Sequence, residues 1–334
     1  TALGALCERV AASVATRTAT ANLETHLTLS TGFAVFPDDA QDAPQLVANA
    51  DQALAEAKQA GRDCWRDYAD VAGANPLVGG APLFSRLARA LHSHRIEVYY
   101  QPILDARTGC VTTFEALARW HEPDLGWVAP SRFIALAEAR GLIAELGRQV
   151  AARAFEQLAS WPNPSDGPGV ALNVSKRQLL DHRFITELLQ LAARYHINPG
   201  RVVLEATERQ ALLQDQRCRH ALEELASRGF RLSLDDFGVG HSCFEMVAEL
   251  PFHELKIDTG LSRKAVTPRG RAIIAAIVRM CEELGLESVA EGVEDHATDR
   301  LLRELGATRL QGHLYSQPLA GEQASRFFLE QLGK

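Results

Sequence analysis

Short apolar segments that alternate with amphipathic helical segments fill the last three quarters of this chain. The predicted strands cover residues 97–103, 113–119, 170–174, 202–206, 231–234, 254–257, 287–290 and 309–312, and helical patterns between them cover 131–140, 146–158, 214–227, 269–284 and 297–305. Eight strands with intervening helices over about 250 residues predict a TIM-type (β/α)8 barrel. A doubly wound open sheet is the alternative, but no GxGxxG motif supports it.

The first 70 residues have a different organisation. Residues 1–20 are Ala-rich and predict a helix, the alternating stretch 27–36 predicts a strand, and a further helix is expected from Pro44 to Gly61. A run of small, Gly- and Pro-rich residues follows over 71–82, which is typical of a linker. We therefore expect a small α+β domain over 1–70, a linker over 71–82 and the barrel over 83–334.

Charge and cysteine usage narrow the possible partners. Lys and Arg total 35 against 42 Asp and Glu, a net charge of −7, which disfavours a nucleic-acid polymer as partner. No apolar run approaches the roughly 20 residues of a membrane span. The six scattered cysteines form no CxxC pair and suggest a reducing compartment. We expect a cytoplasmic location, and a membrane anchor upstream of residue 1 stays open.

Polar residues gather where the predicted strands end. They are Glu115, Asn173, Glu205, Asp235, Asp236, Lys256, Glu291 and Gln311. In a β/α barrel the carboxyl ends of the strands carry the functional groups. Carboxylates in strands are costly unless they are paired or bound to a metal. The alternatives are structural salt bridges inside the barrel and, for the adjacent pair Asp235 and Asp236, a helix N-cap beside a solvated neighbour.

An excess of carboxylates with one amide oxygen favours hard cations such as Mg²⁺ or Mn²⁺. Two such ions about 4 Å apart can activate water and hold a phosphodiester for in-line attack. Asp235 is the residue we expect to bridge them. The residues alone therefore predict a metal-dependent hydrolase of phosphate esters.

Several motifs resemble those of the EAL-domain cyclic di-GMP phosphodiesterases. They are YQPI at 100–103, FEALARW at 114–120, ALNVS with Asn173, LEATE at 204–208, LDDFGVG at 234–240, LKID at 255–258, VAEGVE at 289–294 and Gln311-Gly312. Residues 1–70 resemble the C-terminal half of a GGDEF diguanylate cyclase domain through LTLSTGFAVFPDD and ANADQALAEAKQAGRD. The GGDEF signature itself is absent from the sequence, so no cyclase activity is expected.

The resemblance implies an EAL-type barrel whose first strand is antiparallel to its neighbours, and hydrolysis of cyclic di-GMP to linear pGpG. It implies metal ligands at Glu115, Asn173, Glu205, Asp235, Asp236 and Glu291, and two Mg²⁺ or Mn²⁺ ions. Lys256 and Glu291 would orient or deprotonate the attacking water, Arg119 would contact a phosphate, and Gln101, Glu294 and Gln311 would touch the nucleotide. Glu208 would hold the loop after Asp236, which in the family couples the site to homodimerisation.

Two other functions remain open. The barrel could be a non-catalytic cyclic di-GMP receptor, although such domains typically lose metal ligands and every ligand position is filled here. It could also be an interaction scaffold, which would leave the acidic cluster without a purpose. The sequence departs from the family pattern at Ala118, Ala206, Val239 and His241, none of which is an implied metal ligand.

Overall fold

The computed structural model describes residues 7, 29–36, 39–40, 43–59, 64–68, 80–161, 167–207, 215–238 and 244–332. They belong to two compact units, the first formed by residues 1–85 and 131–136 and the second by residues 86–130 and 137–334. The linker expected over 71–82 lies mostly outside the described residues, so the domain boundary stays a prediction.

The first unit contains a helix that packs against a two-stranded parallel sheet. Strands β1 (Thr31–Phe33) and β2 (Trp65–Asp67) pair, and helix α2 (Ala43–Gln59) lies between them in sequence. A Cβ atom at Gly32 would lie 2.1 Å from the backbone nitrogen of Leu54, so glycine allows β1 to approach the helix. The strand is shorter than the predicted 27–36. The helix predicted over 1–20 lies outside the described residues except for Cys7.

The second unit contains a closed barrel of eight strands. They are β3 (Ile96–Asp105), β4 (Val111–Glu122), β6 (Gly169–Asn173), β7 (Val202–Thr207), β8 (Arg231–Phe237), β9 (Glu254–Ile257), β10 (Glu287–Ala290) and β11 (Arg309–Gln311). Neighbours pair in this order, and the pairing of β11 with β3 closes the ring. β3 runs antiparallel to both β4 and β11, whereas the other barrel pairs are parallel. The expected barrel with an antiparallel first strand is confirmed, and the open sheet is wrong.

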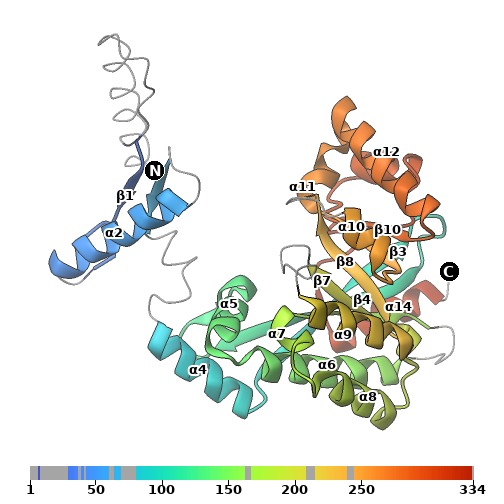
Figure 1. Ribbon diagram of the computed structural model, residues 1–334, viewed down its shortest axis with the longest axis horizontal. Coiled ribbons are helices and arrows are strands. Elements are labelled where there is room, and N and C mark those ends of the chain that lie inside the picture. Colours follow the sequence, from blue (N-terminus) through green and yellow to red (C-terminus); the bar gives the residue numbers. More distant parts are fainter. Residues whose placement is uncertain are drawn as a thin grey trace. The chain divides into compact units, whose positions relative to one another are not determined.

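Helices cover the outside of the strands, with α6, α8 and α9 on one flank and α12 on the other (Figure 1). The helical segments are α4 (Gly80–His92), α5 (Pro130–Arg140), α6 (Ile143–Ser160), α7 (Lys176–Leu179), α8 (Phe184–Arg194), η1 (Pro199–Arg201), α9 (Gln216–Ser227), α10 (Phe244–Glu249), α11 (Thr259–Ser262), η4 (Arg263–Val266), α12 (Pro268–Glu283), α13 (His296–Glu304) and α14 (Gly321–Leu332). Short strands β5 (Gly126–Val128) and β12 (Leu319–Ala320) extend β4 and β3. Local sequence starts several helices: Asp215, Thr267 and Asp295 accept hydrogen bonds from the first turns of α9, α12 and α13.

Alternation along the strands separates an apolar layer from a polar interior. Leu232, Leu234, Leu255 and Ile257 are at most 1% exposed and belong to the core that also contains the covering helices. Each such side chain contributes about 2 kcal/mol of hydrophobic stabilisation. The intervening residues of the same strands are polar and lie inside the barrel, as the contacts of Lys256 with side chains from other strands show. The barrel thus presents a charged interior inside an apolar layer.

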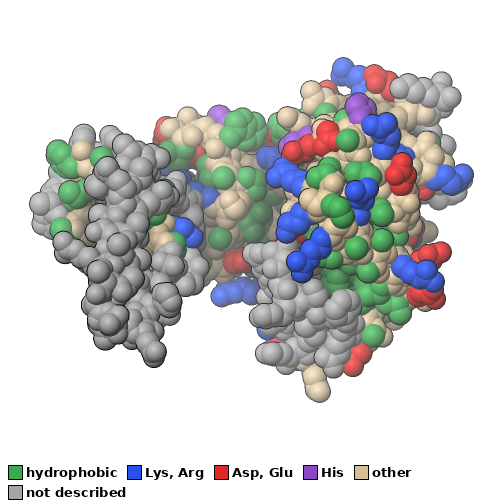
Figure 2. Space-filling model, turned by 90° about the horizontal axis from the view of Figure 1, so that it is seen from above, with side chains coloured by type: hydrophobic (Ala, Val, Ile, Leu, Met, Phe, Trp, Pro, Cys, Tyr) green, Lys and Arg blue, Asp and Glu red, His purple; other side chains and the backbone are tan. Residues whose placement is uncertain are grey.

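The surface of the larger unit mixes charges of both signs. On the face shown in Figure 2, basic and acidic side chains are interspersed among apolar ones. Within the described part of the chain, no helix combines the length and apolar character needed to cross a bilayer.

Candidate active site

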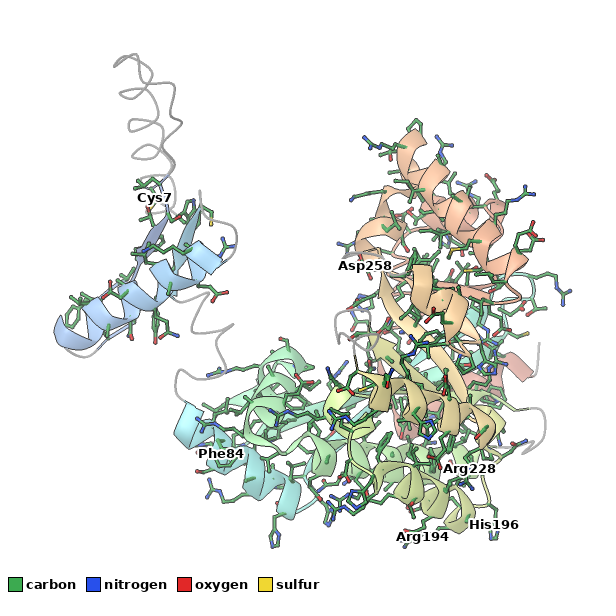
Figure 3. The ribbon with its side chains drawn as sticks, viewed as in Figure 1. Cys7, Phe84, Arg194, His196, Arg228 and Asp258 are labelled. Atoms are coloured by element: carbon green, nitrogen blue, oxygen red, sulfur yellow. The ribbon has the colours of Figure 1, made fainter. Side chains whose placement is uncertain are left out.

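The carboxyl ends of the parallel strands lie at one end of the barrel. Asp258, which directly follows β9, marks this end in Figure 3. Arg228 and His196, which precede β8 and β7, lie at the opposite end (Figure 3). The carboxyl ends of the strands are where β/α barrels carry their functional groups.

A buried ammonium group surrounded by carboxylates lies at this end. The side chain of Lys256 is 1% exposed. Its Nζ lies 2.7 Å from Oε1 of Glu291, 3.0 Å from Oε1 of Glu205, 3.6 Å from Oε2 of Glu115 and 3.7 Å from Oδ1 of Asp235. We call these four acidic residues the carboxylate ring. The structure therefore brings together five residues that the sequence had singled out on five different strand ends.

A bulge in β8 sets the position of the adjacent acids. The pairing of β8 with β9 shifts by one residue between Leu234 and Phe237, and Asp236 adopts φ 61°. Asp235 Oδ1 accepts a hydrogen bond from the backbone N–H of Asp236 at 2.8 Å. A left-handed aspartate is uncommon and carries strain, which is typical of functional sites. The bulge leaves Asp235 buried beside Lys256 and Asp236 half-buried.

A chain of amide side chains holds Glu115 in place. Asn173 Nδ2 donates to Glu115 Oε1 at 2.9 Å, and Gln311 Nε2 donates to Oε2 at 2.7 Å. Gln311 Nε2 also lies 3.3 Å from Gln101 Oε1, and Gln101 Nε2 donates to the carbonyl of Ser316 at 3.3 Å. β4 lies between β3 and β6 and near β11, so each donor comes from a neighbouring part of the barrel. Three more of the predicted site residues thus contact the ring or each other.

The ring carries more negative charge than Lys256 neutralises, because four carboxylates face one ammonium group. Burial, reinforced by neighbouring carboxylates, raises the pKa of Glu205 well above its usual range and that of Glu291 to about 7. Burial opposes ionisation of Glu115 as well, but Lys256 and the amide donors lower its pKa. Burial would lower the pKa of Lys256, yet the carboxylates raise it well above its ordinary value. The lysine is therefore charged, and the ring attracts further cations or protons.

Glu205 shows most clearly that the ring needs a cation. It is fully buried, and among the described residues no hydrogen bond of ordinary geometry reaches either carboxylate oxygen, although Lys256 Nζ is close to one. Buried carboxylate oxygens are normally satisfied by donors or metal ions. Lys256 Nζ lies at the centre of the ring. In the described ranges, no three His, Cys, Asp or Glu side chains are arranged so that they could hold a metal ion without moving. The oxygen-only donor set and its surplus charge still suit a hard divalent cation.

A cavity of ≈ 360 Å³ opens beside the ring. Residues that line it come from β3, β4 and the segments after β9, β10 and β11; they are Gln101, Glu115, Leu117, Thr259, Arg263, Glu291, Gly292, Glu294, Gln311, Gly312 and His313. Cavities of this size are in the range that binds small molecules. The carboxylate ring is therefore accessible from one side through Glu115 and Glu291.

Two other predicted residues, Arg119 and Glu294, make contacts outside the ring. Arg119 is four residues beyond Glu115 on β4; its guanidinium lies 5.8 Å from the ring centroid of Tyr99, and burial lowers its pKa. Glu294 lies at the cavity and pairs with Arg263. Glu208 and the loop residues Val239 and His241 lie outside the described residues, so the roles expected for them stay predictions.

Two groups of residues were missed by sequence reasoning. Thr259, Arg263 and His313 line the cavity. Their position in the sequence could have identified them, because each follows the end of a strand within six residues. A second charged group lies nearer the amino ends of β8, β9, β10 and β11: Arg231, Glu254, Glu287 and Arg309. The period-2 alternation places these side chains inside the barrel, but they precede the strand ends at which functional residues were expected.

Known proteins similar to this chain include cyclic di-GMP enzymes. The bifunctional diguanylate cyclase/cyclic di-GMP phosphodiesterase MucR of Pseudomonas aeruginosa is 34% identical over 302 residues, which are 90% of this chain and 44% of that protein. The cyclic di-GMP phosphodiesterase PdeR of Escherichia coli is 30% identical over 307 residues, 92% of this chain and 46% of that protein. The chain thus spans less than half the length of these relatives.

Solved structures of EAL proteins resemble this chain in fold. The PaMucR phosphodiesterase in complex with c-di-GMP has a TM-score of 0.68 and 34% identity, covering 73% of this chain and 99% of that one. The EAL enzyme Bd1971 in its cGMP-bound form has a TM-score of 0.71 and 27% identity, covering 77% and 72%. The family model of the diguanylate cyclase GGDEF domain matches residues 1–64, and that of the EAL domain matches residues 85–318. Both parts of the expected resemblance are confirmed, and the chain belongs to the EAL domain family.

Proposed function

We propose that the barrel hydrolyses one phosphodiester bond of cyclic di-GMP and releases linear pGpG. The carboxylate ring around Lys256 carries this proposal, because four acids, three of them buried, face one ammonium group and form a site that requires cations. The names of MucR and PdeR support the choice of substrate. The cavity beside the ring supports access for a small molecule.

We assign the cation ligands to Glu115, Asn173, Glu205, Asp235, Asp236 and Glu291, and the cations to two Mg²⁺ or Mn²⁺ ions. The unsatisfied oxygens of Glu205 and the raised pKa values of Glu205 and Glu291 support this assignment, since a divalent cation would take the place of the missing donors and protons. When bound, such ions supply Lewis acidity that lowers the pKa of water.

The chain's own residues have distinct roles around the reacting phosphate. Glu291 is placed to accept a proton from the attacking water, because it lines the cavity and Lys256 holds its carboxylate in position. Lys256 fixes the orientation of Glu291 through their 2.7 Å contact and opposes negative charge that develops nearby. Glu115 is already held by amide donors, so its geometry is set before substrate binds.

Substrate contacts fall to residues around the cavity. Gln101 and Gln311 lie in its lining and are linked to each other, so they present positioned amides to a nucleotide. Glu294 lines the same cavity. The partly buried guanidinium of Arg119 suits a phosphate oxygen, because an arginine fork binds two oxygens of one group. We assign to Glu208 the role of holding the loop after Asp236. We assign to that loop a contact between the two subunits of a homodimer.

The distribution of cysteines in the sequence indicates the cellular compartment of this part of the chain. The six cysteines are scattered along the sequence and form no CxxC pair, which is typical of proteins in a reducing compartment. We place this part of the chain in the cytoplasm.

The proposal is tested by incubating purified protein with cyclic di-GMP and Mg²⁺ or Mn²⁺ and separating the products by chromatography. We expect pGpG that disappears with a chelator and in the Asp235→Ala variant. Intact cyclic di-GMP that binds but is never cut would instead identify a receptor. Equal specific activity in dilute monomer and concentrated dimer would contradict the dimer assignment alone.

A further inference from the structure

An exposed ion pair lies at the mouth of the cavity. Arg263 starts η4, shortly after β9, and Glu294 lies in the segment between β10 and α13. Arg263 Nη2 lies 2.5 Å from Glu294 Oε1, and the two side chains are 58% and 49% exposed. Both residues line the cavity together with Gln311 and with Glu115 and Glu291 of the carboxylate ring. The pair is therefore accessible to the same ligand that reaches the ring.

We propose that Arg263 and Glu294 act together as the reader of a guanine base, which makes Arg263 a specificity-determining residue. This inference rests on the proposed function and adds the base preference. Guanine offers two acceptors, O6 and N7, which an arginine fork binds with two hydrogen bonds. It offers two donors, N1–H and the N2 amino group, which one carboxylate accepts. Adenine places a donor at the O6 position and an acceptor at N1, so it opposes both contacts.

The pair can exchange partners at little cost. One contact, between Arg263 Nη2 and Glu294 Oε1, joins the two side chains, and both are about half exposed. Ion pairs in such positions are weak because water screens them. A guanine that enters between the two side chains replaces one charged contact with two pairs of matched hydrogen bonds. Adenine would break the pair without replacing it, so the pair works against the wrong base.

Charge favours the same arrangement. The carboxylate ring has a surplus of negative charge, which repels an anionic dinucleotide until cations bind. Arg263 places a positive charge at the entrance, opposite in sign to the ring. A purely structural pair would tie η4 to the β10–α13 segment instead. That role predicts an effect on stability that is the same for every substrate.

The test compares wild type with Arg263→Ala, Arg263→Lys and the matched control Lys264→Ala, the exposed neighbour in η4. We would measure kcat/KM and equilibrium binding for cyclic di-GMP and cyclic di-AMP. Arg263→Ala should lose roughly tenfold in kcat/KM for cyclic di-GMP, mainly through KM, and should lose nothing for cyclic di-AMP, because the pair that adenine would have to break is gone. Arg263→Lys keeps the charge but not the fork, so it should lose most of the same discrimination. Lys264→Ala should behave as wild type.

Each other outcome has a definite meaning. Equal losses for both dinucleotides in Arg263→Ala, or no loss, overturn the guanine-reading role and leave the phosphodiesterase proposal intact. Wild type that binds but does not cut defeats the phosphodiesterase proposal, and the binding ratios then decide base reading alone. Wild type that neither binds nor cuts cyclic di-GMP overturns both.

Discussion

The barrel contains two layers of charged side chains, and they differ in balance. Near the amino ends of the strands lie Arg231, Glu254, Glu287 and Arg309, which we call the amino-end layer. It has two arginines and two glutamates. Near the carboxyl ends lies the carboxylate ring, with four acids around Lys256. The strands β8, β9 and β10 contribute to both layers, so the difference comes from the side chains and not from the scaffold.

The positive and negative charges of the amino-end layer balance. Arg309 contacts Glu254 at 2.9 Å and Glu287 at 2.7 Å, and Arg231 also pairs with Glu287. Burial raises the pKa of Glu254 and Arg309 opposes that rise. Buried pairs of this kind contribute little net stability, but the loss of one partner is costly. The comparison teaches that burial of charge alone does not mark a functional site; an imbalance that other side chains leave uncorrected does.

The largest effect should come from breaking the ring without harming the fold. Asp235→Ala removes a proposed cation ligand, and we expect turnover to fall by roughly a thousandfold, since bound cations contribute several kcal/mol to catalysis. The melting temperature of the metal-free variant should be at least as high as that of metal-free wild type, because one surplus negative charge is gone. Calorimetry measures the melting temperature, and a product assay measures turnover. A variant that retains turnover would show that the ring does not act in catalysis.

The matched change in the amino-end layer should have the opposite profile. Glu254→Ala leaves Arg309 without one of its buried partners, and we expect a loss of roughly 4 kcal/mol in unfolding free energy. Turnover measured well below the melting temperature should stay within a few-fold of wild type. Urea titration gives the stability. If Glu254→Ala instead removed activity at full stability, the two layers would share one role.

The carboxylate ring should also make the stability of the metal-free protein depend on pH. The raised pKa of Glu291, about 7 against 4.5 for an ordinary glutamate, stabilises the metal-free fold below pH 4.5. That contribution, on the order of 3 kcal/mol, is lost as pH rises through 7, because the folded state holds the proton more tightly than the unfolded state. Added Mn²⁺ should raise the melting temperature more at pH 7.5 than at pH 5.5. In Glu291→Gln the metal-free pH dependence should be smaller; an unchanged profile would exclude this group.

The smallest effect concerns the bulge. Asp236 has φ 61°, which glycine adopts without strain. Asp236→Gly should therefore stabilise the metal-free protein by about 1 kcal/mol while it weakens cation binding. Asp236→Asn, which tolerates the same conformation and keeps one oxygen, serves as the control. Reduced stability in Asp236→Gly would mean that the carboxylate itself supports the fold.

The sequence predicted the barrel and most of the ring because both depend on alternation. The bounds of β9 and β10 were predicted to the residue, since apolar and polar positions change sharply there. β4 is longer than expected because it continues into a pairing with β5, and such extensions depend on a partner strand. The pairing of Arg309 with Glu254 joins residues 55 apart, and nothing local in the sequence shows it. The same holds for Arg263 and Glu294, which two separate loops bring together.

Direct titration of Mn²⁺ into wild type, Asp235→Ala and Glu254→Ala tests the central claim, that surplus charge distinguishes the functional layer. Calorimetry reports binding without any need for turnover. We predict saturable binding to wild type and Glu254→Ala, and weak or absent binding to Asp235→Ala. Equal binding by all three proteins, or none by wild type, would contradict the account.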